Sequence, residues 1–335
     1  MRSHHFPQTR AARLLRPMGV VVLVVAALTA PAGEVAAASA CRITTLPVPA
    51  EAWESRVIAG DPNGRYLIGS GLVSGPGRSD VSLLWVDGRL TDFPTPFEWV
   101  TLIDVNSAGT IVGFVDTSEG RVGFRYQRGA FSILPGLDPA DMTIPVAVNS
   151  RGDVLGNSSS PTSGERIVVW PARRPDLPPW LVTAMDLTAV DIDDDGTVLV
   201  NNSGWGLNTW LWTLDGGLQQ IGGPSGGGDV RGLAIRKGWI GGFEFSLGMS
   251  AAWRVQGGPV NRPPAGYGFP TAVNRHGDLA FVNAGVVDRR NGGVVVLPGL
   301  GGNFTPEVRF LSDRGLVAGS ANDSVSTRAT VWNGC

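Results

Sequence analysis

The stretch VNSAGTIVG, residues 105–113, recurs along the chain in altered form. It contains an apolar residue, an Asn-x-x-Gly turn and a second apolar run. Related stretches are DPNGRYLIG (61–69), VNSRGDVLG (148–156), IDDDGTVLV (192–200), IRKGWIGG (235–242), VNRHGDLAF (273–281) and LSDRGLVAG (311–319). The turn glycines, 38 to 45 residues apart, are Gly64, Gly109, Gly152, Gly196, Gly238, Gly277 and Gly315. A period of this length is typical of repeat architectures.

The rest of each repeat predicts further β-strands. A second apolar stretch follows the turn, a third centres on an aromatic residue, and a fourth short stretch ends the unit. Asp288 replaces the aromatic in the sixth unit, and the other units have Trp85, Tyr126, Trp170, Trp212, Trp253 and Trp332. Four strands in about 42 residues are typical of a β-propeller blade. We therefore predict an all-β, seven-bladed propeller of four-stranded blades over residues 41–335.

The turn residues support this interpretation. Asn at the first position of a type I turn caps the backbone with its side chain, and Gly three residues later accepts a left-handed conformation. The pairs Asn106–Gly109, Asn149–Gly152 and Asn274–Gly277 fit this pattern. We expect these asparagines to be structural.

The pattern as a whole resembles the HAF-repeat family of bacterial extracellular proteins. VAVNSRGDVLG and VVVLPGLGGNFTPEVRF carry the resemblance best, and the units depart from it chiefly at Ile235 and Asp288. The resemblance implies a secreted, β-propeller-like array. It implies no catalytic residues.

The first 40 residues predict a secretory signal peptide. Four arginines precede the apolar run GVVVLVVAALTA (19–30), and ASA (38–40) lies directly before Cys41. The run is too short to span a bilayer, and no other segment is long and apolar enough. We therefore expect an exported, extracellular protein with no transmembrane segment. Export favours a disulfide between the two cysteines, Cys41 and Cys335. Lipid modification of Cys41 is the alternative, although Ala38 stands where such sites carry a Leu-like residue.

The stretch ATVWNGC (329–335) ends a third strand at Trp332 and begins a turn. The missing fourth strand lies after Cys41, because RITTLP (42–47) matches RLTDFP (89–94), the fourth strand of the first unit. We predict that the segment after Cys41 completes the seventh blade and that the disulfide replaces the hairpin turn. The two Cα atoms should then be about 5 to 6 Å apart.

Composition argues against several classes of function. Residues 41–335 carry a net charge of about −5, with Lys237 the only lysine and His276 the only histidine. Nucleic acids and anionic membranes require a basic field that such a chain lacks. A single histidine in a tight turn disfavours Ser-His-Asp triads and zinc sites. We expect no cofactor, no metal and no nucleic-acid partner, and we expect a monomer.

Two short motifs fit the repeat better than a functional site. DIDDDG (191–196) begins like a calcium loop, but Leu199 and Asn202 stand where later ligands belong. We interpret it as an acidic variant of the repeat turn, and whether it binds calcium stays open. GPSGG (223–227) matches a hydrolase elbow but lacks the required strand before it and helix after it.

The long connections predict a binding face. Turns between the first and second strands, and between the third and fourth strands, are expected to be short. Links between the second and third strands, and between units, are long and share one face of a propeller, which we name the long-loop face. Acidic and aromatic residues recur near the start of units, and the ligand-binding candidates are Glu98, Trp99, Asp141, Trp180, Asp186, Trp205, Asp229, Tyr267 and Glu307. Such a face suits a glycan, a cation or a basic peptide.

Two functions remain open from sequence. The first is a secreted recognition or scaffold module that binds a glycan or protein ligand on the long-loop face. The alternative is a carboxylate-dependent glycosidase or lyase using Glu98, Asp141, Asp186 or Glu307. Carboxylates paired across the central channel would favour the enzyme, and carboxylates spread toward solvent would favour binding.

Overall fold

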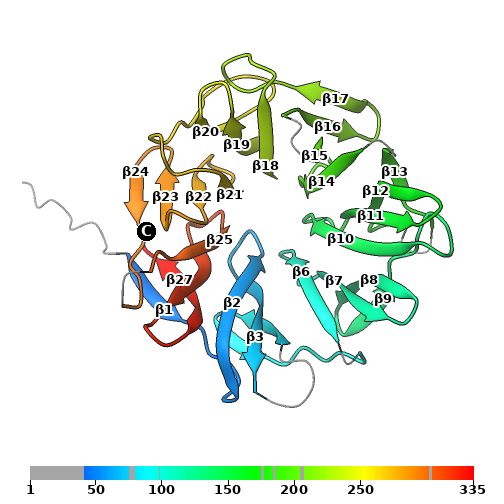
Figure 1. Cartoon of the computed structure of the whole chain (residues 1–335), viewed down its shortest axis with the longest axis horizontal. Coiled ribbons are helices and arrows are strands. Elements are labelled where there is room, and N and C mark those ends of the chain that lie inside the picture. The colour runs from blue at the N-terminus through cyan, green and yellow to red at the C-terminus, as the bar shows by residue number, and fades with distance from the viewer. Residues whose placement is uncertain are drawn as a thin grey trace, which may run out of the picture. The chain divides into compact units, whose positions relative to one another are not determined.

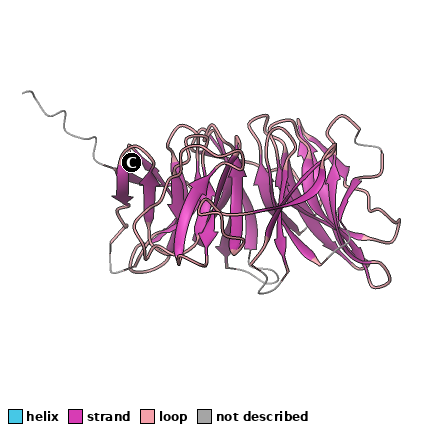
Figure 2. Ribbon diagram, turned by 90° about the horizontal axis from the view of Figure 1, so that it is seen from above, coloured by secondary structure: helices cyan, strands magenta, loops and turns pink. Residues whose placement is uncertain are grey.

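The computed structural model describes residues 41–74, 80–97, 99–174, 177–183, 186–203, 207–301 and 304–335. The predicted signal peptide (1–40) and two predicted site residues, Glu98 and Trp205, lie outside this part. The described residues form β-strands joined by turns and loops, without helices (Figure 2). Within them, no helix has the length and apolar character needed to cross a membrane.

The strands form seven antiparallel sheets, arranged as blades around a central axis (Figure 1). Blades 1 and 2 are β2 (Ala52–Gly60), β3 (Tyr66–Val73), β4 (Asp80–Val86) and β5 (Arg89–Thr91), then β6 (Val100–Val105), β7 (Ile111–Thr117), β8 (Gly120–Gln127) and β9 (Ala130–Ile133). Blades 3 and 4 are β10 (Met142–Val148), β11 (Val154–Ser160), β12 (Gly164–Trp170) and β13 (Trp180–Thr183), then β14 (Leu187–Ile192), β15 (Val198–Asn202), β16 (Thr209–Thr213) and β17 (Gly217–Ile221).

Blades 5 and 6 are β18 (Val230–Arg236), β19 (Trp239–Glu244) and β20 (Met249–Trp253), then β21 (Pro270–Val273), β22 (Leu279–Phe281), β23 (Val286–Arg289) and β24 (Gly293–Val296). Blade 7 is β25 (Glu307–Leu311), β26 (Val317–Asn322), β27 (Thr327–Asn333) and β1 (Arg42–Thr45). The prediction of a seven-bladed, all-β propeller is confirmed.

The first strand of each blade lies at the centre and contacts the first strand of the next blade, including β25 with β2 (Figure 1). The hydrophobic core of the described residues is divided into seven clusters, one between each pair of neighbouring blades. Burial of apolar surface between blades therefore holds the ring together.

The ring closes as predicted. β1 pairs antiparallel with β27, with Arg42 opposite Asn333 and Thr45 opposite Thr330. The Cys41–Cys335 disulfide joins the two strands at the position of a hairpin turn. Its Cα atoms are 4.5 Å apart, slightly closer than expected but within the range of protein disulfides.

The repeated aromatic residue and the Leu-Pro sequence of the fourth stretch form a link between blades. The indole Nε1 of Trp85, Trp170 and Trp332 donates to the carbonyl of a proline that follows the last strand of the preceding blade, at 2.7 to 2.8 Å. Those prolines are Pro47, Pro135 and Pro298. The repeat thus encodes contacts between units as well as strands within them.

The turns between first and second strands also join neighbouring blades. All seven predicted turn glycines have φ between 73° and 93°, as a left-handed turn position requires. Asn106 Oδ1 accepts from the amides of Ala108 and Thr110, while its Nδ2 donates to the Asn149 carbonyl of the next blade. Asn149 and Asn274 repeat the arrangement. These asparagines are therefore structural: each shapes its own turn and donates a hydrogen bond to the corresponding turn of the next blade.

Two details differ from the prediction. Blade 5 has three strands, and only an isolated bridge between Ala252 and Asn261 stands where a fourth would pair. Prolines at 259, 263 and 264 remove donors that a fourth strand would need. The third-to-fourth connection of blade 3 is also long, running from Trp170 to Trp180, because its four prolines prevent a tight hairpin.

Candidate functional site

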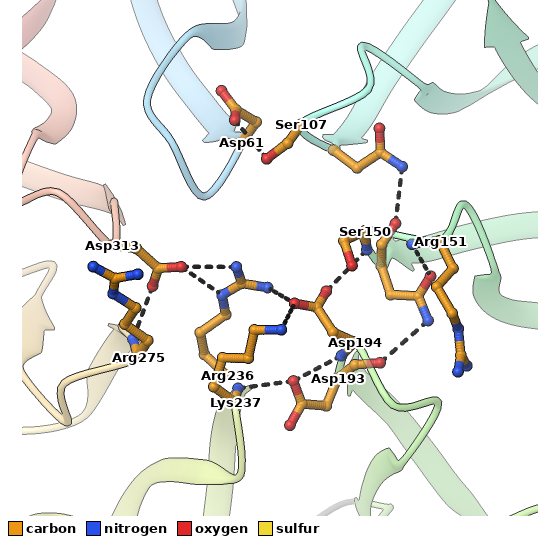
Figure 3. Close-up of polar contacts among 12 residues, drawn as sticks. Asp61, Ser107, Ser150, Arg151, Asp193, Asp194, Arg236, Lys237, Arg275 and Asp313 are labelled. Atoms are coloured by element: carbon orange, nitrogen blue, oxygen red, sulfur yellow. Dashed lines mark hydrogen bonds and ion pairs between the residues drawn. The ribbon is translucent and has the colours of Figure 1, made fainter.

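The short turns between first and second strands, and between third and fourth strands, share one face, which we name the short-turn face. At its centre Arg236 lies across the mouth of the channel (Figure 3). Its guanidinium is 2.7 Å from Asp194 of blade 4 and 2.8 Å from Asp313 of blade 7. The turn after Arg236 has only two residues, Lys237 and Gly238, both with positive φ. This two-residue turn is how blade 5 departs from the repeat after Ile235. Because of it, Arg236 lies at the mouth of the channel.

The carboxylates that hold Arg236 have further donors. Asp194 accepts from Lys237 Nζ at 2.9 Å and from the Ser150 amide at 2.9 Å, and Asp313 accepts from the Arg275 amide at 2.8 Å. Burial acts to raise the pKa of Asp194, but the hydrogen bonds from Lys237 and Ser150 and the charge of Arg236 outweigh it and hold that pKa at about 2. Asp194 is therefore ionised at neutral pH.

The acidic stretch DIDDDG forms the corresponding turn of blade 4. Asp193 accepts from the amides of Lys237 and Gly238 at 2.8 and 2.6 Å, and Asp195 accepts from the amide of Thr197 at 2.8 Å. Together with the ion pairs of Asp194, these contacts provide protein donors for the carboxylates of Asp193, Asp194 and Asp195. No group of three or more His, Cys, Asp or Glu side chains suited to a metal was found among the described residues.

Two aspartates lie inside the channel below this mouth. Asp104 and Asp191 occupy the same position, just after a bulge in the first strand, in blades 2 and 4. Each accepts the amide of its own next residue and an amide of the next blade, from Val148 and Ile235 respectively, all at 2.8 Å. Burial raises the pKa of both carboxyls to about 7, and the negative charge of Asp191 contributes to the shift of Asp104.

The cavity around these two aspartates is small. Its volume is about 160 Å³, and Arg236 and Phe310 are among its lining residues. Ligand pockets usually have about 300 to 1,000 Å³. Sequence reasoning missed Asp104 because it ends an apolar strand and matches no motif. The occurrence of Asp at the same place in two repeats, in DVN and DID, was the only available signal.

The predicted acidic candidates do not converge on one site. The described members lie in different blades: Asp141 before β10, Asp186 before β14, Asp229 before β18 and Glu307 in β25. Asp141 pairs with Arg166 at 2.5 Å, and its side chain is fully buried. Burial opposes its ionisation, but hydrogen bonds from Ser158, the Asp138 amide and Arg166, with the charge of Arg166, lower its pKa. Glu307 forms an ion pair with Arg309, two residues later in β25.

The aromatic candidates also separate. Tyr267 packs against Phe281, with ring centroids 5.6 Å apart, in the core between blades 5 and 6. Trp180 begins β13 and therefore lies at the short-turn face, with part of its ring in the core between blades 3 and 4. Trp99 is half-buried just before β6.

An aromatic cluster that the sequence interpretation did not assemble lies on the long-loop face. Phe243, Phe245 and Phe269 have ring centroids 4.6 to 6.0 Å apart. Phe269 is 48% exposed and nearby Leu247, in the loop after β19, is 49% exposed. The amide of Phe245 donates to the carbonyl of the predicted candidate Asp229 at 3.0 Å. The alternation in FEF (243–245) was the signal, since residues two apart share one side of a strand.

The larger hollows of the described residues lie mostly on the opposite face. One of them, about 800 Å³, is a groove between blades 3 and 4 lined by short-turn residues and by Trp180. Hollows of about 500 and 550 Å³ lie between blades 4 and 5 and near Cys335, at the same face. A hollow of about 320 Å³ beside Glu54 and Arg56 lies at the long-loop face.

No protein-family model and no curated protein sequence matches the chain. Among solved structures, it is similar to a catalytically inactive histidine-to-alanine variant of virginiamycin B lyase from Staphylococcus aureus with quinupristin, at 12% identity and TM-score 0.58, covering 87% of this chain and 99% of that one. A streptogramin B lyase matches at 14% identity and TM-score 0.53, covering 88% and 97%.

A third similar structure is the β-propeller domain of the trilobed protease from Pyrococcus furiosus, at 9% identity and TM-score 0.57, covering 84% of this chain and 96% of that one. That domain has an open velcro topology, whereas here β1 closes the last blade. Identities this low show a shared fold and nothing more.

Proposed function

We propose that the protein is an exported recognition module that binds a protein or glycan ligand on its long-loop face. The disulfide between Cys41 and Cys335 fits an extracellular protein. The signal-peptide pattern and the resemblance to HAF-repeat proteins support the same assignment. A ring closed by a strand pair and a disulfide is a stable scaffold on which loops can vary.

The observation that carries this proposal is the aromatic cluster of Phe243, Phe245 and Phe269. Three contacting phenylalanines, one of them half-exposed beside an exposed Leu247, are more than the scattered apolar residues of an ordinary surface. Aromatic side chains at the centre of an interface contribute much of the binding energy. Other exposed apolar residues of the same face are Trp53, Phe304 and Val325.

The state of the acidic candidates favours binding over hydrolysis. A glycosidase needs one carboxylic acid with a raised pKa. The pKa of Asp141 is lowered instead, and Asp141 and Glu307 are each engaged by an arginine. Asp104 and Asp191 have raised pKa values, but their cavity of about 160 Å³ is too small for a ligand pocket.

The likeness to lyases does not carry a lyase activity over to this chain. In one of those proteins, replacing a histidine by alanine inactivates catalysis. His276 is the only histidine here beyond residue 40, and it lies at the short-turn face. Its Nε2 is 3.1 Å from Arg275 Nε and 3.2 Å from the Asp313 carbonyl oxygen, so it is already engaged by protein groups.

The test is a capture experiment with secreted protein purified from culture, against extracellular proteins and a glycan array. Phe269→Ala should reduce binding of the captured ligand by about tenfold or more, as loss of an interface anchor does. Val296→Ala is the matched control, because Val296 is an exposed apolar residue on the outer strand of blade 6. Equal binding by wild type and Phe269→Ala would contradict the proposal, as would turnover of the ligand by the purified protein.

A further inference from the structure

The groove between blades 3 and 4 is formed in part by a connection that is longer than the repeat pattern predicts. Its first wall includes residues 171–174 and Trp180, from the two ends of the long third-to-fourth connection of blade 3. The equivalent turns of blades 1 and 2 have two residues, Asp87–Gly88 and Arg128–Gly129. Blade 3 thus carries an extended connection at the edge of a hollow of about 800 Å³.

The floor of the groove is apolar and aromatic. Trp180 is half-buried, with part of its ring in the groove lining and part in the core, and Trp212 lies beside it. Val169, Ile192 and Leu214 add to the apolar lining. At about 800 Å³ the groove has the size of pockets that bind small molecules and short oligomers.

The two walls carry opposite charges. Arg173 and Arg174 on the blade 3 wall are exposed, and neither has an ion-pair partner within the described ranges. Arg151, by contrast, is paired with Asp153 at 2.8 Å. The blade 4 wall presents the exposed carboxylates of Asp195 and Asp215.

We propose that this groove binds an acidic oligosaccharide, with one sugar ring against Trp180, a sugar carboxylate on Arg173 or Arg174, and sugar hydroxyl groups on Asp195 and Asp215. A carboxylated sugar has the three chemistries that the groove complements. Its apolar C–H face packs on an aromatic ring, its carboxylate accepts bidentate hydrogen bonds from a guanidinium, and its hydroxyls donate to carboxylates. This site lies on the face opposite the aromatic cluster and is independent of the function proposed above.

The test measures binding of trigalacturonate by calorimetry to the secreted protein and to the double variant Arg173→Ala/Arg174→Ala. Both arginines are exposed, so the double variant should fold, as its melting temperature will verify. Loss of charge-assisted hydrogen bonds should weaken trigalacturonate binding by about tenfold or more. Arg128→Ala, an exposed arginine of the same face outside the groove, is the matched control and should bind as wild type does.

Two further ligands and one variant make the result specific. Neutral galactotriose should bind at least about tenfold more weakly than trigalacturonate, because it lacks the carboxylates. Phe269→Ala should leave trigalacturonate binding unchanged, which separates this site from the long-loop face. No binding of trigalacturonate at millimolar concentration, equal binding by the double variant, or equal binding of galactotriose would overturn the proposal. Equal binding of a triglutamate peptide would also overturn it and would assign the groove to acidic peptides.

Discussion

Arg236 of blade 5 and Asp313 of blade 7 form an ion pair across the mouth of the channel, with Nη2 2.8 Å from the carboxylate (Figure 3). Blade 6 lies between blades 5 and 7 in the ring. The ion pair therefore links two blades that are not neighbours. Asp194 of blade 4 completes the bridge at 2.7 Å.

Removing Arg236 should destabilise the ring. Asp194 and Asp313 are only 10% and 9% exposed, so Arg236→Met leaves two largely buried carboxylates without their main partner. We expect a loss of about 2 to 3 kcal/mol in the free energy of unfolding, measured in urea at pH 7. Lys237→Ala, which removes a 52% exposed partner of the same Asp194, should cost less than about 1 kcal/mol. Equal effects of the two substitutions would contradict the role given to Arg236.

Stability should fall as pH rises from about 4 to about 7. The folded pKa of Asp104 and Asp191 is about 7, above the ordinary value of 3.8, so the native state binds more protons than the unfolded state in this interval. Each carboxyl contributes a slope of at most about 1.4 kcal/mol per pH unit. Asp194, with a pKa of about 2, acts in the opposite sense, and its contribution is lost below pH 4. Chemical denaturation between pH 3 and 8 should therefore find the maximum near pH 4 to 5.

The control for this pH dependence is the pair of variants Asp104→Asn and Asp191→Asn. Each loses one titrating group, so the slope between pH 4 and 7 should flatten in each and flatten most in the double variant, where the raised pKa of Asp288 still contributes. The slope is the readout, because the amide replaces a hydrogen-bond acceptor and changes absolute stability as well. An unchanged slope in the double variant would show that other groups titrate.

Reduction of the Cys41–Cys335 disulfide should lower the melting temperature. The bridge joins residues 294 apart in sequence, for which the chain-entropy relation gives roughly 5 to 6 kcal/mol, less any structure retained in the unfolded chain. Limited proteolysis after reduction should cleave first near β1 and β27 and leave blades 2 to 5 protected. Cys41→Ser/Cys335→Ser should behave as the reduced protein does. Proteolysis that begins in another blade would contradict closure through β1.

The tryptophan links between blades can be tested as a matched pair. Trp170→Phe removes the hydrogen bond from Nε1 to the Pro135 carbonyl, whereas Trp253 Nε1 is buried and has no hydrogen-bond partner in the described part of the chain. Both substitutions remove similar ring volume. Trp170→Phe should therefore cost about 1 to 2 kcal/mol more than Trp253→Phe in the free energy of unfolding. Equal losses would show that packing alone explains the repeated tryptophan.

The ring could be predicted from the sequence because each repeat carries its own short, recognisable pattern. Period, turn glycines and the match of RITTLP to RLTDFP were enough to predict the seven blades and the pairing of β1 with β27. The missing fourth strand of blade 5 was not predicted, because the regular repeat outweighed the signal of Pro259, Pro263 and Pro264 against a strand in residues 254–269. The place of that strand is taken by Asn261, which donates to Asp288 at 2.6 Å, so two departures from the repeat meet in one contact.

The candidate sites were harder to predict because they depend on closure of the ring. Arg236 and Asp313 are 77 residues apart, and nothing in the sequence of either repeat indicates that the two side chains meet. Asp104 and Asp191, in β6 and β14, likewise line one cavity only when the first strands of the blades surround the channel. The aromatic cluster joins β19 to residue 269, across the stretch whose structure was not foreseen.

The central claim, that a ligand binds the long-loop face at the aromatic cluster, is tested most directly by site-specific photocrosslinking. A benzoylphenylalanine at position 247 projects from that face beside the cluster, and the same probe at position 296 serves as a control on the outer strand of blade 6. Irradiation with the captured ligand should give a covalent adduct from position 247 and little or none from position 296. Adducts of equal yield from both positions, or from position 296 alone, would contradict the claim.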